Sequence, residues 1–406
     1  MPFILSLLLA CGISLIGLML FRRTPPNPYL DSLRLGKSHY LLLGILLGIF
    51  FPETETVFRP FEMVRHNLMG IILLWLGLQT GLATDLQPLR NLQFSALASQ
   101  ATIILPTGIF TVLAVLASGP VLYNHLGLID NLPLAIVLLT GFAITTRAPE
   151  PIARWTDRTL PAHLQVQNRP IDNIASLGLL TLAFPFVAKD SVFYFSDLPF
   201  VGPLGYILLT IGLSVAGGIA LDFIFRSQAD ELRSPSLIFG IVITLFGLSQ
   251  MPGLPALSIG FLAGIWLINT TVAKREVVES LGRASDTIKP IFYTLLGTII
   301  GGFSGASFFL FAPLLPLAVV LILVRGMGRT IGLTISQTIW QIPETWRELI
   351  GQSWHPQGTL AIAIGVQAMY LLQFEHHTLI AGITLAVLLG QVIIVPPHPF
   401  PQPNRD

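Results

Sequence analysis

Charged residues are scarce in this sequence. Only 11% of its 406 residues are Asp, Glu, Lys or Arg, whereas 53% are hydrophobic, and an ordinary soluble domain has about 25% charged residues. The mean hydropathy is +0.75. A soluble protein of this length needs many more charged side chains on its surface, so the composition excludes a soluble enzyme and a disordered chain. The formal net charge of +1 also excludes a strongly basic surface for nucleic acid.

Cysteine and long polar segments are lacking as well. Cys11 is the only cysteine, which excludes an internal disulfide framework and a cysteine-based metal cluster. No loop between apolar runs exceeds about 25 residues, so we expect no soluble catalytic domain. The sequence also lacks HExxH, GxSxG and clustered His and Asp residues, which argues against an intramembrane hydrolase. We predict that the protein is not an enzyme and has no cofactor.

Long apolar runs fill the sequence instead. A helix needs roughly 20 apolar residues to cross about 30 Å of hydrocarbon. We identify thirteen candidate spans, near residues 3–21, 39–51, 66–84, 92–117, 132–147, 162–188, 200–225, 234–250, 255–273, 288–304, 306–333, 357–374 and 377–395. The predicted fold class is an all-α polytopic membrane protein with about 13 transmembrane helices.

The basic residues divide unequally between the two sides of these spans. With thirteen spans, nineteen of the 22 Lys and Arg residues lie on the side of the loops that follow odd-numbered spans. The other three are Arg59, Arg65 and Lys189. Cytoplasmic loops carry an excess of Lys and Arg, so this division predicts an N-terminus outside and a C-terminus in the cytoplasm.

Asp172 is the clearest charge at membrane depth. Sixteen residues separate it from Lys189, which places it roughly 25 Å from the outer end of its span. An ionisable group at this depth suggests a functional site. Pro170 either interrupts a longer helix and frees a backbone carbonyl, or begins the helix with Asp172 in its first turn. Asn173 follows Asp172 directly.

Two basic residues can each be interpreted in two ways. Arg325 ends the apolar run LPLAVVLILV and precedes residues that are still compatible with a helix. It is either embedded and paired with a carboxylate, for which Asp172 is the candidate at comparable depth, or it extends to the cytoplasm. Lys289 precedes Pro290 at the start of the tenth span, and we expect it at the membrane interface.

The fifth and twelfth spans are polar and rich in helix-breaking residues. They occupy corresponding positions when spans two to six are compared with spans nine to thirteen. Interrupted segments at corresponding positions of two halves indicate a transporter binding site. The relevant residues are Gly141, Thr145, Thr146, Arg147 and Pro149 in the fifth span, and Gly358, Gly365 and Gln367 in the twelfth.

Seven segments, taken in order, resemble the monovalent cation/proton antiporter superfamily, whose members include the sodium/hydrogen exchanger-like transmembrane domains. They are LWLGLQTGLATDLQPLR, ITTRAPEPIARW, RPIDNIASLGLLTLAF, LSIGFLAGIWL, KPIFYTLLGTIIGG, LILVRGMGR and HPQGTLAIAIG. The resemblance covers nearly the whole chain. It implies inverted repeats with two crossed, discontinuous helices, a core domain, a dimerisation domain and an elevator-like movement between the two domains.

We therefore expect one transmembrane transporter domain over 1–395 and a short cytoplasmic tail over 396–406. The predicted core bundle comprises spans near 66–188 and 306–395. The predicted dimerisation or scaffold part comprises spans near 1–51 and 200–304.

The resemblance also reveals a departure at the ion site. In the family the cation-binding carboxylate is the second member of an acidic or Asn-Asp pair, and that position holds Asn173 here. Asp172 occupies the first position, which in the family pairs with a Lys or Arg, here Arg325. The Thr-x-Pro signature is also altered, because either Thr146 or Arg147 takes the Thr position.

The leading functional hypothesis is exchange of protons for Na⁺ or K⁺. Asp172 would be the exchangeable carboxylate and the ligand of the monovalent cation, with neutral oxygens from Asn173, Thr145 and Thr146. Arg325 would be the charge partner, while the secondary candidates are Arg147, Lys289 and Gln367, and the helix breaks are Gly141, Pro149, Pro170, Gly358 and Gly365. The expected partners are monovalent cations, protons, the lipid bilayer of the cell membrane and a second copy of the chain, with no nucleic acid.

Two further functions are compatible with the sequence. The first is a sodium-coupled or uncoupled transporter of an organic or anionic solute on the same fold, because the usual carboxylate position holds Asn173. The second is a passive channel or an intramembrane enzyme, and no nucleophile–base pair supports the enzyme.

Overall fold

The structure is a computed structural model. It describes residues 39–50, 59–86, 98, 101–114, 171–187, 201–226, 235–272, 274–304, 314–340, 358–371 and 384–387. Within these residues the only regular secondary structure is helical, in agreement with the predicted all-α class.

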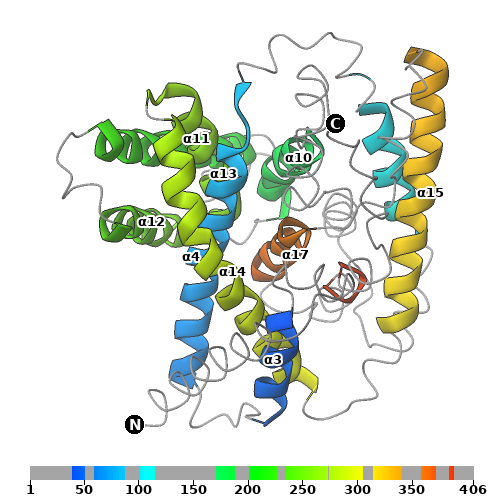
Figure 1. Cartoon of the computed structure of the whole chain (residues 1–406), viewed down its shortest axis with the longest axis horizontal. Coiled ribbons are helices and arrows are strands. Elements are labelled where there is room, and N and C mark those ends of the chain that lie inside the picture. The colour runs from blue at the N-terminus through cyan, green and yellow to red at the C-terminus, as the bar shows by residue number, and fades with distance from the viewer. Residues whose placement is uncertain are drawn as a thin grey trace, which may run out of the picture.

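The helices follow the apolar runs of the sequence (Figure 1). Their bounds are α3 His39–Phe50, α4 Arg59–Leu82, α10 Ile171–Val187, α11 Val201–Arg226, α12 Pro235–Gln250, α13 Ala256–Thr270, α14 Lys274–Ser304, α15 Leu314–Trp340 and α17 Thr359–Leu371. A further helix covers Ala101–Ala114.

Two helices begin well before the predicted spans. α4 starts at Arg59 rather than near residue 66, and α14 starts at Lys274 rather than near residue 288. The early part of α14 is polar on one side but buries Val277, Leu281 and Ile288, which lie on one helical face. A search for apolar runs misses such an amphipathic extension because its mean hydropathy is low.

The helices differ in their ability to cross a bilayer. Within the described residues, Gly202–Arg226 and Ala318–Trp340 are long and apolar enough to do so alone. By contrast, α17 has 13 residues and therefore extends roughly 20 Å, about two thirds of the hydrocarbon thickness. A helix this short fits a discontinuous span. The count of thirteen spans stays a prediction.

Helices α4 and α13 cross at two pairs of glycines. A Cβ atom built on Gly81 would lie 2.9 Å from the Cα of Gly264, and one built on Gly264 would lie 2.9 Å from the Cα of Gly81. Gly77 and Gly260, one turn earlier in each helix, face the partner's backbone in the same way. Small residues at a four-residue spacing allow this close approach, which is a common basis of helix packing in membranes.

Helices α3 and α14 cross in the same manner. A Cβ on Gly44 would lie 2.8 Å from the Cα of Gly297, and a Cβ on Gly297 would lie 2.6 Å from the Cα of Gly44. One turn further, a Cβ on Gly301 would lie 3.0 Å from the Cα of Gly48. The two crossings therefore use the same glycine spacing.

These two crossings reveal an internal repeat. Residues 41–50 read LLLGILLGIF and residues 257–266 read LSIGFLAGIW, while 74–82 read LWLGLQTGL and 294–302 read TLLGTIIGG. Thus α3 corresponds to α13 and α4 to α14, so the α3–α14 crossing repeats as α13–α4. Corresponding helices are seven spans apart in the predicted order. Because seven is odd, the two helices of each pair cross the membrane in opposite directions, as inverted repeats require.

A third close contact joins α15 to the helix Ala101–Ala114, which runs beside it in Figure 1. Gly328 of α15 faces the backbone at Thr107, and Gly332 faces the backbone at Ile103. At the end of α15, the Nε1 of Trp340 donates a hydrogen bond to the Oγ1 of Thr102 over 3.2 Å. Small residues again set the distance between the helices.

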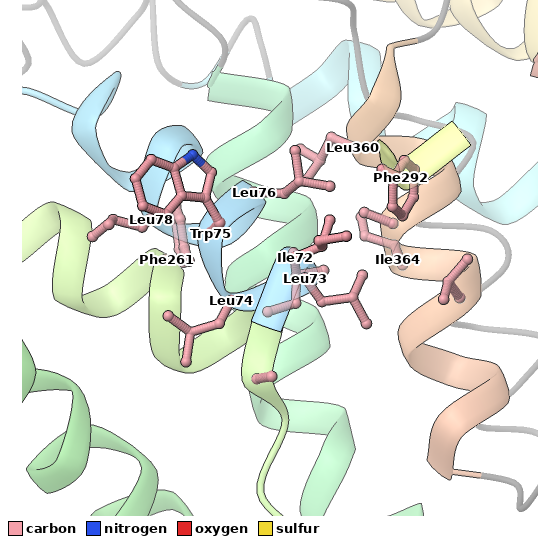
Figure 2. Close-up of a cluster of buried hydrophobic side chains, with 14 of the residues drawn as sticks. Ile72, Leu73, Leu74, Trp75, Leu76, Leu78, Phe261, Phe292, Leu360 and Ile364 are labelled. Atoms are coloured by element: carbon pink, nitrogen blue, oxygen red, sulfur yellow. The ribbon is translucent and has the colours of Figure 1, made fainter. Parts of the chain in front are cut away.

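The centre of the apolar core lies around α4. Side chains from Ile72 to Leu78 pack with Phe261 of α13, Phe292 of α14 and Leu360 and Ile364 of α17 (Figure 2). The Trp75 ring stacks on Phe239 of α12 with centroids 4.8 Å apart, and its Nε1 donates to the Oγ of Ser285 over 3.0 Å. Helix α4 therefore packs chiefly with predicted scaffold spans, whereas the predicted division assigned 66–84 to the core bundle.

The crossing of α4 and α13 provides a stability prediction. We expect Gly260→Leu to lower the midpoint of thermal unfolding in detergent by about 5 °C or more, because the side chain would force two backbones apart. Gly247→Leu is the matched control, since no atom lies within 4 Å of a Cβ at that exposed position of α12. Equal midpoints for the two variants would show that the glycine contact does not stabilise the protein.

Candidate functional site

The predicted ion-site helix is α10. It begins at Ile171, so Asp172 and Asn173 lie in its first turn, and Asn173 is buried at 1% exposure. The side chain of Asp172 is outside the described part of the structure. Helix α10 contacts α17, α11 and α13 and lies beside α17 in Figure 1. The helix that carries the predicted carboxylate therefore packs against the helix of the twelfth span.

The predicted residues of the fifth span cannot be placed beside α10. Gly141, Thr145, Thr146, Arg147 and Pro149 lie outside the described residues, and so does Pro170. Their roles stay predictions.

Helix α17 begins abruptly and is buried along most of its length. Gly358 precedes the helix, which starts at Thr359 and runs without interruption through Gly365. The predicted helix break at Gly365 is therefore wrong, because the residue lies in a regular turn. Every side chain from Leu360 to Ala368 is buried.

Gln367 makes a specific contact with a second helix. Its Oε1 accepts a hydrogen bond from the backbone N–H of Leu257 over 3.0 Å, in the first turn of α13. The first N–H groups of a helix have no partner within the helix, and the N-cap residue Pro255 supplies no side-chain hydrogen bond. The side chain predicted as a secondary site residue thus binds a helix N-terminus in this structure.

Two arginines are buried one turn apart on α15. Arg325 is 5% exposed and Arg329 is 2% exposed. The burial of Arg325 agrees with the embedded interpretation rather than with extension into water. Arg329 was not among the predicted site residues, although its spacing of four from Arg325 places the two on one helical face.

The buried charges of the described residues are all basic. Besides the two arginines of α15, they are Arg65 of α4 and Lys289 of α14, at 5% and 6% exposure. Lys289, expected at the membrane interface, is thus buried within the protein, while its depth in the membrane stays a prediction. A buried positive charge is costly without a negative or polar counterpart, and each of the four has an interaction partner within the structure.

The acidic residue after the third span has a structural partner. Asp85 Oδ2 lies 3.1 Å from the Nζ of Lys274, which ties the end of α4 to the start of α14. Asn269 of α13 joins the same end of α4, since its Nδ2 donates to the carbonyl of Thr84 and its Oδ1 accepts from the N–H of Leu86. These polar contacts and the glycine crossing hold α4, α13 and α14 together.

The described residues contain no group of three or more His, Cys, Asp or Glu side chains that could hold a metal ion. The predicted site is of another kind, with one carboxylate and neutral oxygens for a monovalent cation. Its candidate residues in the described part are Asn173 and the backbone around Asp172.

Comparisons with known proteins identify the fold. No protein-family model matches the sequence, and no curated protein matches it either. Among solved structures, the chain is similar to the sodium proton antiporter MjNhaP1 from Methanocaldococcus jannaschii at pH 8, with a TM-score of 0.58 and 14% sequence identity. The likeness covers 95% of this chain and 98% of that chain. The chain thus has a polytopic antiporter fold, which confirms the fold expected from the resemblance.

The burial of Arg329 provides a second stability prediction. We expect Arg329→Leu to lower the thermal midpoint by about 5 °C or more, because Leu is smaller and leaves part of the space around this 2% exposed side chain unfilled. Arg226→Leu is the matched control, since the Arg226 side chain is 54% exposed. It lies 2.7 Å from Asp222 and donates to the carbonyl of Thr270 over 3.2 Å. The interactions of an exposed arginine contribute about 0–1 kcal/mol, so a larger loss in the control than in Arg329→Leu would contradict this assignment.

Proposed function

We propose that the protein is a secondary active transporter that exchanges protons for a monovalent cation, Na⁺ or K⁺. The observation that carries the proposal is the likeness in fold to a sodium proton antiporter over 95% of the chain. The packing of α10, with Asp172 and Asn173, against the short helix α17 supports it, because transporter sites form where discontinuous helices meet. A transport role also agrees with the absence of motifs for catalysis from the sequence.

Asp172 is the proposed exchange site. Deprotonated, it binds the cation with neutral oxygens from Asn173, Thr145 and Thr146; protonated, it lets the empty carrier return. The carboxylate cannot hold a proton and a cation at the same time, and this is sufficient to couple the flows of the two ions. Arg325 is the proposed charge partner, and it holds the unoccupied carboxylate in its ionised form.

The proposed movement is of the elevator type. Helices α10 and α17, with the Arg-bearing α15, belong to the moving core, while α4, α13, α14 and α3 belong to the scaffold. The glycine crossings α4–α13 and α3–α14 support this division, since helices in backbone contact move together. This division places the span near 66–84 in the scaffold, because α4 packs chiefly with α13 and α14.

The protein is proposed to lie in the cell membrane with its N-terminus outside and its C-terminus in the cytoplasm. The uneven distribution of Lys and Arg supports this orientation. It is also proposed to form a homodimer, as the resemblance implies.

A second candidate function is transport of an organic or anionic solute, coupled to sodium or uncoupled. One observation favours it. Asn173 stands where the family has its binding carboxylate, so the usual cation ligand is absent from that position.

Asp172→Asn tests the main proposal. We expect the variant to lose pH-dependent cation exchange in proteoliposomes, because an amide cannot alternate between a proton and a cation. The measurement uses an internal pH probe with gradients of Na⁺, K⁺ or Li⁺. Asp222→Asn is the matched control, since Asp222 pairs with Arg226 near the surface of α11 and should keep full exchange.

The two candidate functions give different results in this assay. Exchange that persists fully in Asp172→Asn contradicts the assignment of Asp172. Uptake of an anionic solute without proton movement by the wild type would favour the second function.

A further inference from the structure

One face of α17 makes three directional contacts with three scaffold helices. The Oγ1 of Thr359 lies 3.1 Å from the OH of Tyr293 in α14, and Gln367 accepts from Leu257 of α13. The ring of Tyr370 meets the ring of His66 in α4 edge to face, with centroids 4.4 Å apart. At about 100° per residue the three positions on α17 fall within an arc of about 80°.

The scaffold beneath this face is firmly joined. Helices α4 and α13 are in backbone contact at their glycines, and Trp75 and Asp85 of α4 bind Ser285 and Lys274 of α14. None of these contacts involves α17. The three contacts of α17 therefore join one helix to three helices that are held together by their own contacts.

The contact of Gln367 is the most specific of the three. Its partner, the Leu257 N–H, belongs to a helix N-terminus that lacks a local side-chain cap, and Gln367 is 5% exposed. Water is therefore a poor substitute, and an unsatisfied N–H in this place is costly. An axial slide of α17 by the rise of one residue, about 1.5 Å, is enough to lengthen a 3.0 Å hydrogen bond beyond its useful range.

The residue next to Leu257 offers a second buried polar group. Ser258 follows Leu257 and is fully buried, yet its Oγ has no hydrogen-bond partner among the described residues. Two adjacent polar groups thus lie in the same turn of α13, and Gln367 binds the N–H of one of them.

We propose that Gln367 is a positioning residue that latches α17 to the first turn of α13 in this conformation, and that each transport cycle must release it. The latch sets the rate of the conformational step and does not bind the transported ion. This inference rests on the proposed function in one respect, since it requires α17 to move against α13. Conformational steps limit turnover in many enzymes, and we expect the same of this release.

Two substitutions at Gln367 have opposite expected effects. Gln367→Met keeps the volume and loses the acceptor, so release becomes easier and turnover of exchange rises by about threefold or more. Gln367→Glu keeps an acceptor and adds negative charge at a helix N-terminus, which strengthens the contact, so turnover falls. Ser258→Ala is the matched control in the same turn and should behave like the wild type.

Hydrogen–deuterium exchange tests the contact between Gln367 and α13 without a transport measurement. In Gln367→Met, amides of residues 254–260 and 359–371 should exchange roughly tenfold faster, while those around Gly81 and Gly264 keep their protection. Gln367→Glu should restore the protection. Unchanged exchange in Gln367→Met, or loss of protection that spreads to the glycine crossing, overturns the proposal.

The transport assay separates a latch from an ion ligand. A shift between conformations scales the apparent affinities for Na⁺, K⁺ and Li⁺ by one common factor, whereas loss of a ligand oxygen changes their ratio. A changed ratio, an unchanged turnover, or a fall in turnover in both variants overturns the latch. If the wild type exchanges none of the three cations, cation exchange fails as the function, and the hydrogen-exchange pattern alone decides whether Gln367 is a latch.

Discussion

The backbone contact between α4 and α13 is the constraint on which the rest of the described structure depends. Lipid tails are as apolar as leucine, so burial of apolar surface provides little force between helices in a membrane, and close packing must replace it. Glycines at a four-residue spacing allow that packing twice, because the α3–α14 crossing repeats the α13–α4 crossing with corresponding sequences. An insertion of one Cβ at either crossing would separate two helices that carry many other contacts.

The helices joined by the two glycine crossings form a surface against which the short helix α17 packs. Helix α17 is too short to cross a bilayer, yet its side chains from Leu360 to Ala368 are buried. Ala361, Ala363 and Ala368 belong to the apolar core. Thr359 and Gln367 form hydrogen bonds with α14 and α13, and the ring of Tyr370 contacts the ring of His66 in α4. Apolar contacts of this kind tolerate sliding, whereas a hydrogen bond to a single N–H does not. The interface of α17 therefore combines apolar contacts that permit sliding with a few contacts that favour one axial position of the helix.

Much of this arrangement could be predicted from the sequence, because its signals are local. The apolar runs predict α11, α12 and α13 to within two or three residues, and the GFLAG stretch of 260–264 indicates the helix that crosses α4. The polar first half of α14 was missed because burial of Val277 and Leu281 depends on neighbouring helices. Arg329 was missed because the sequence of one span does not show whether a second arginine is buried. The Gln367–Leu257 bond was missed because that sequence does not show which helix N-terminus needs a partner. Asp172, Thr145 and Thr146 remain predictions, since their side chains lie outside the described residues.

One carboxylate decides what the proposed site can hold. Arg65, Lys289, Arg325 and Arg329 are buried on α4, α14 and α15, and each has an interaction partner within the structure, so their charge alone does not select the substrate. The proposed cation exchange needs a carboxylate at the site, and Asn173 cannot provide one, so the proposal depends on Asp172. If Asp172 is instead fully committed to an arginine, the proposed site has no carboxylate left for a cation. Under the proposal, cation binding thus depends on whether this one carboxylate is free to exchange its partner.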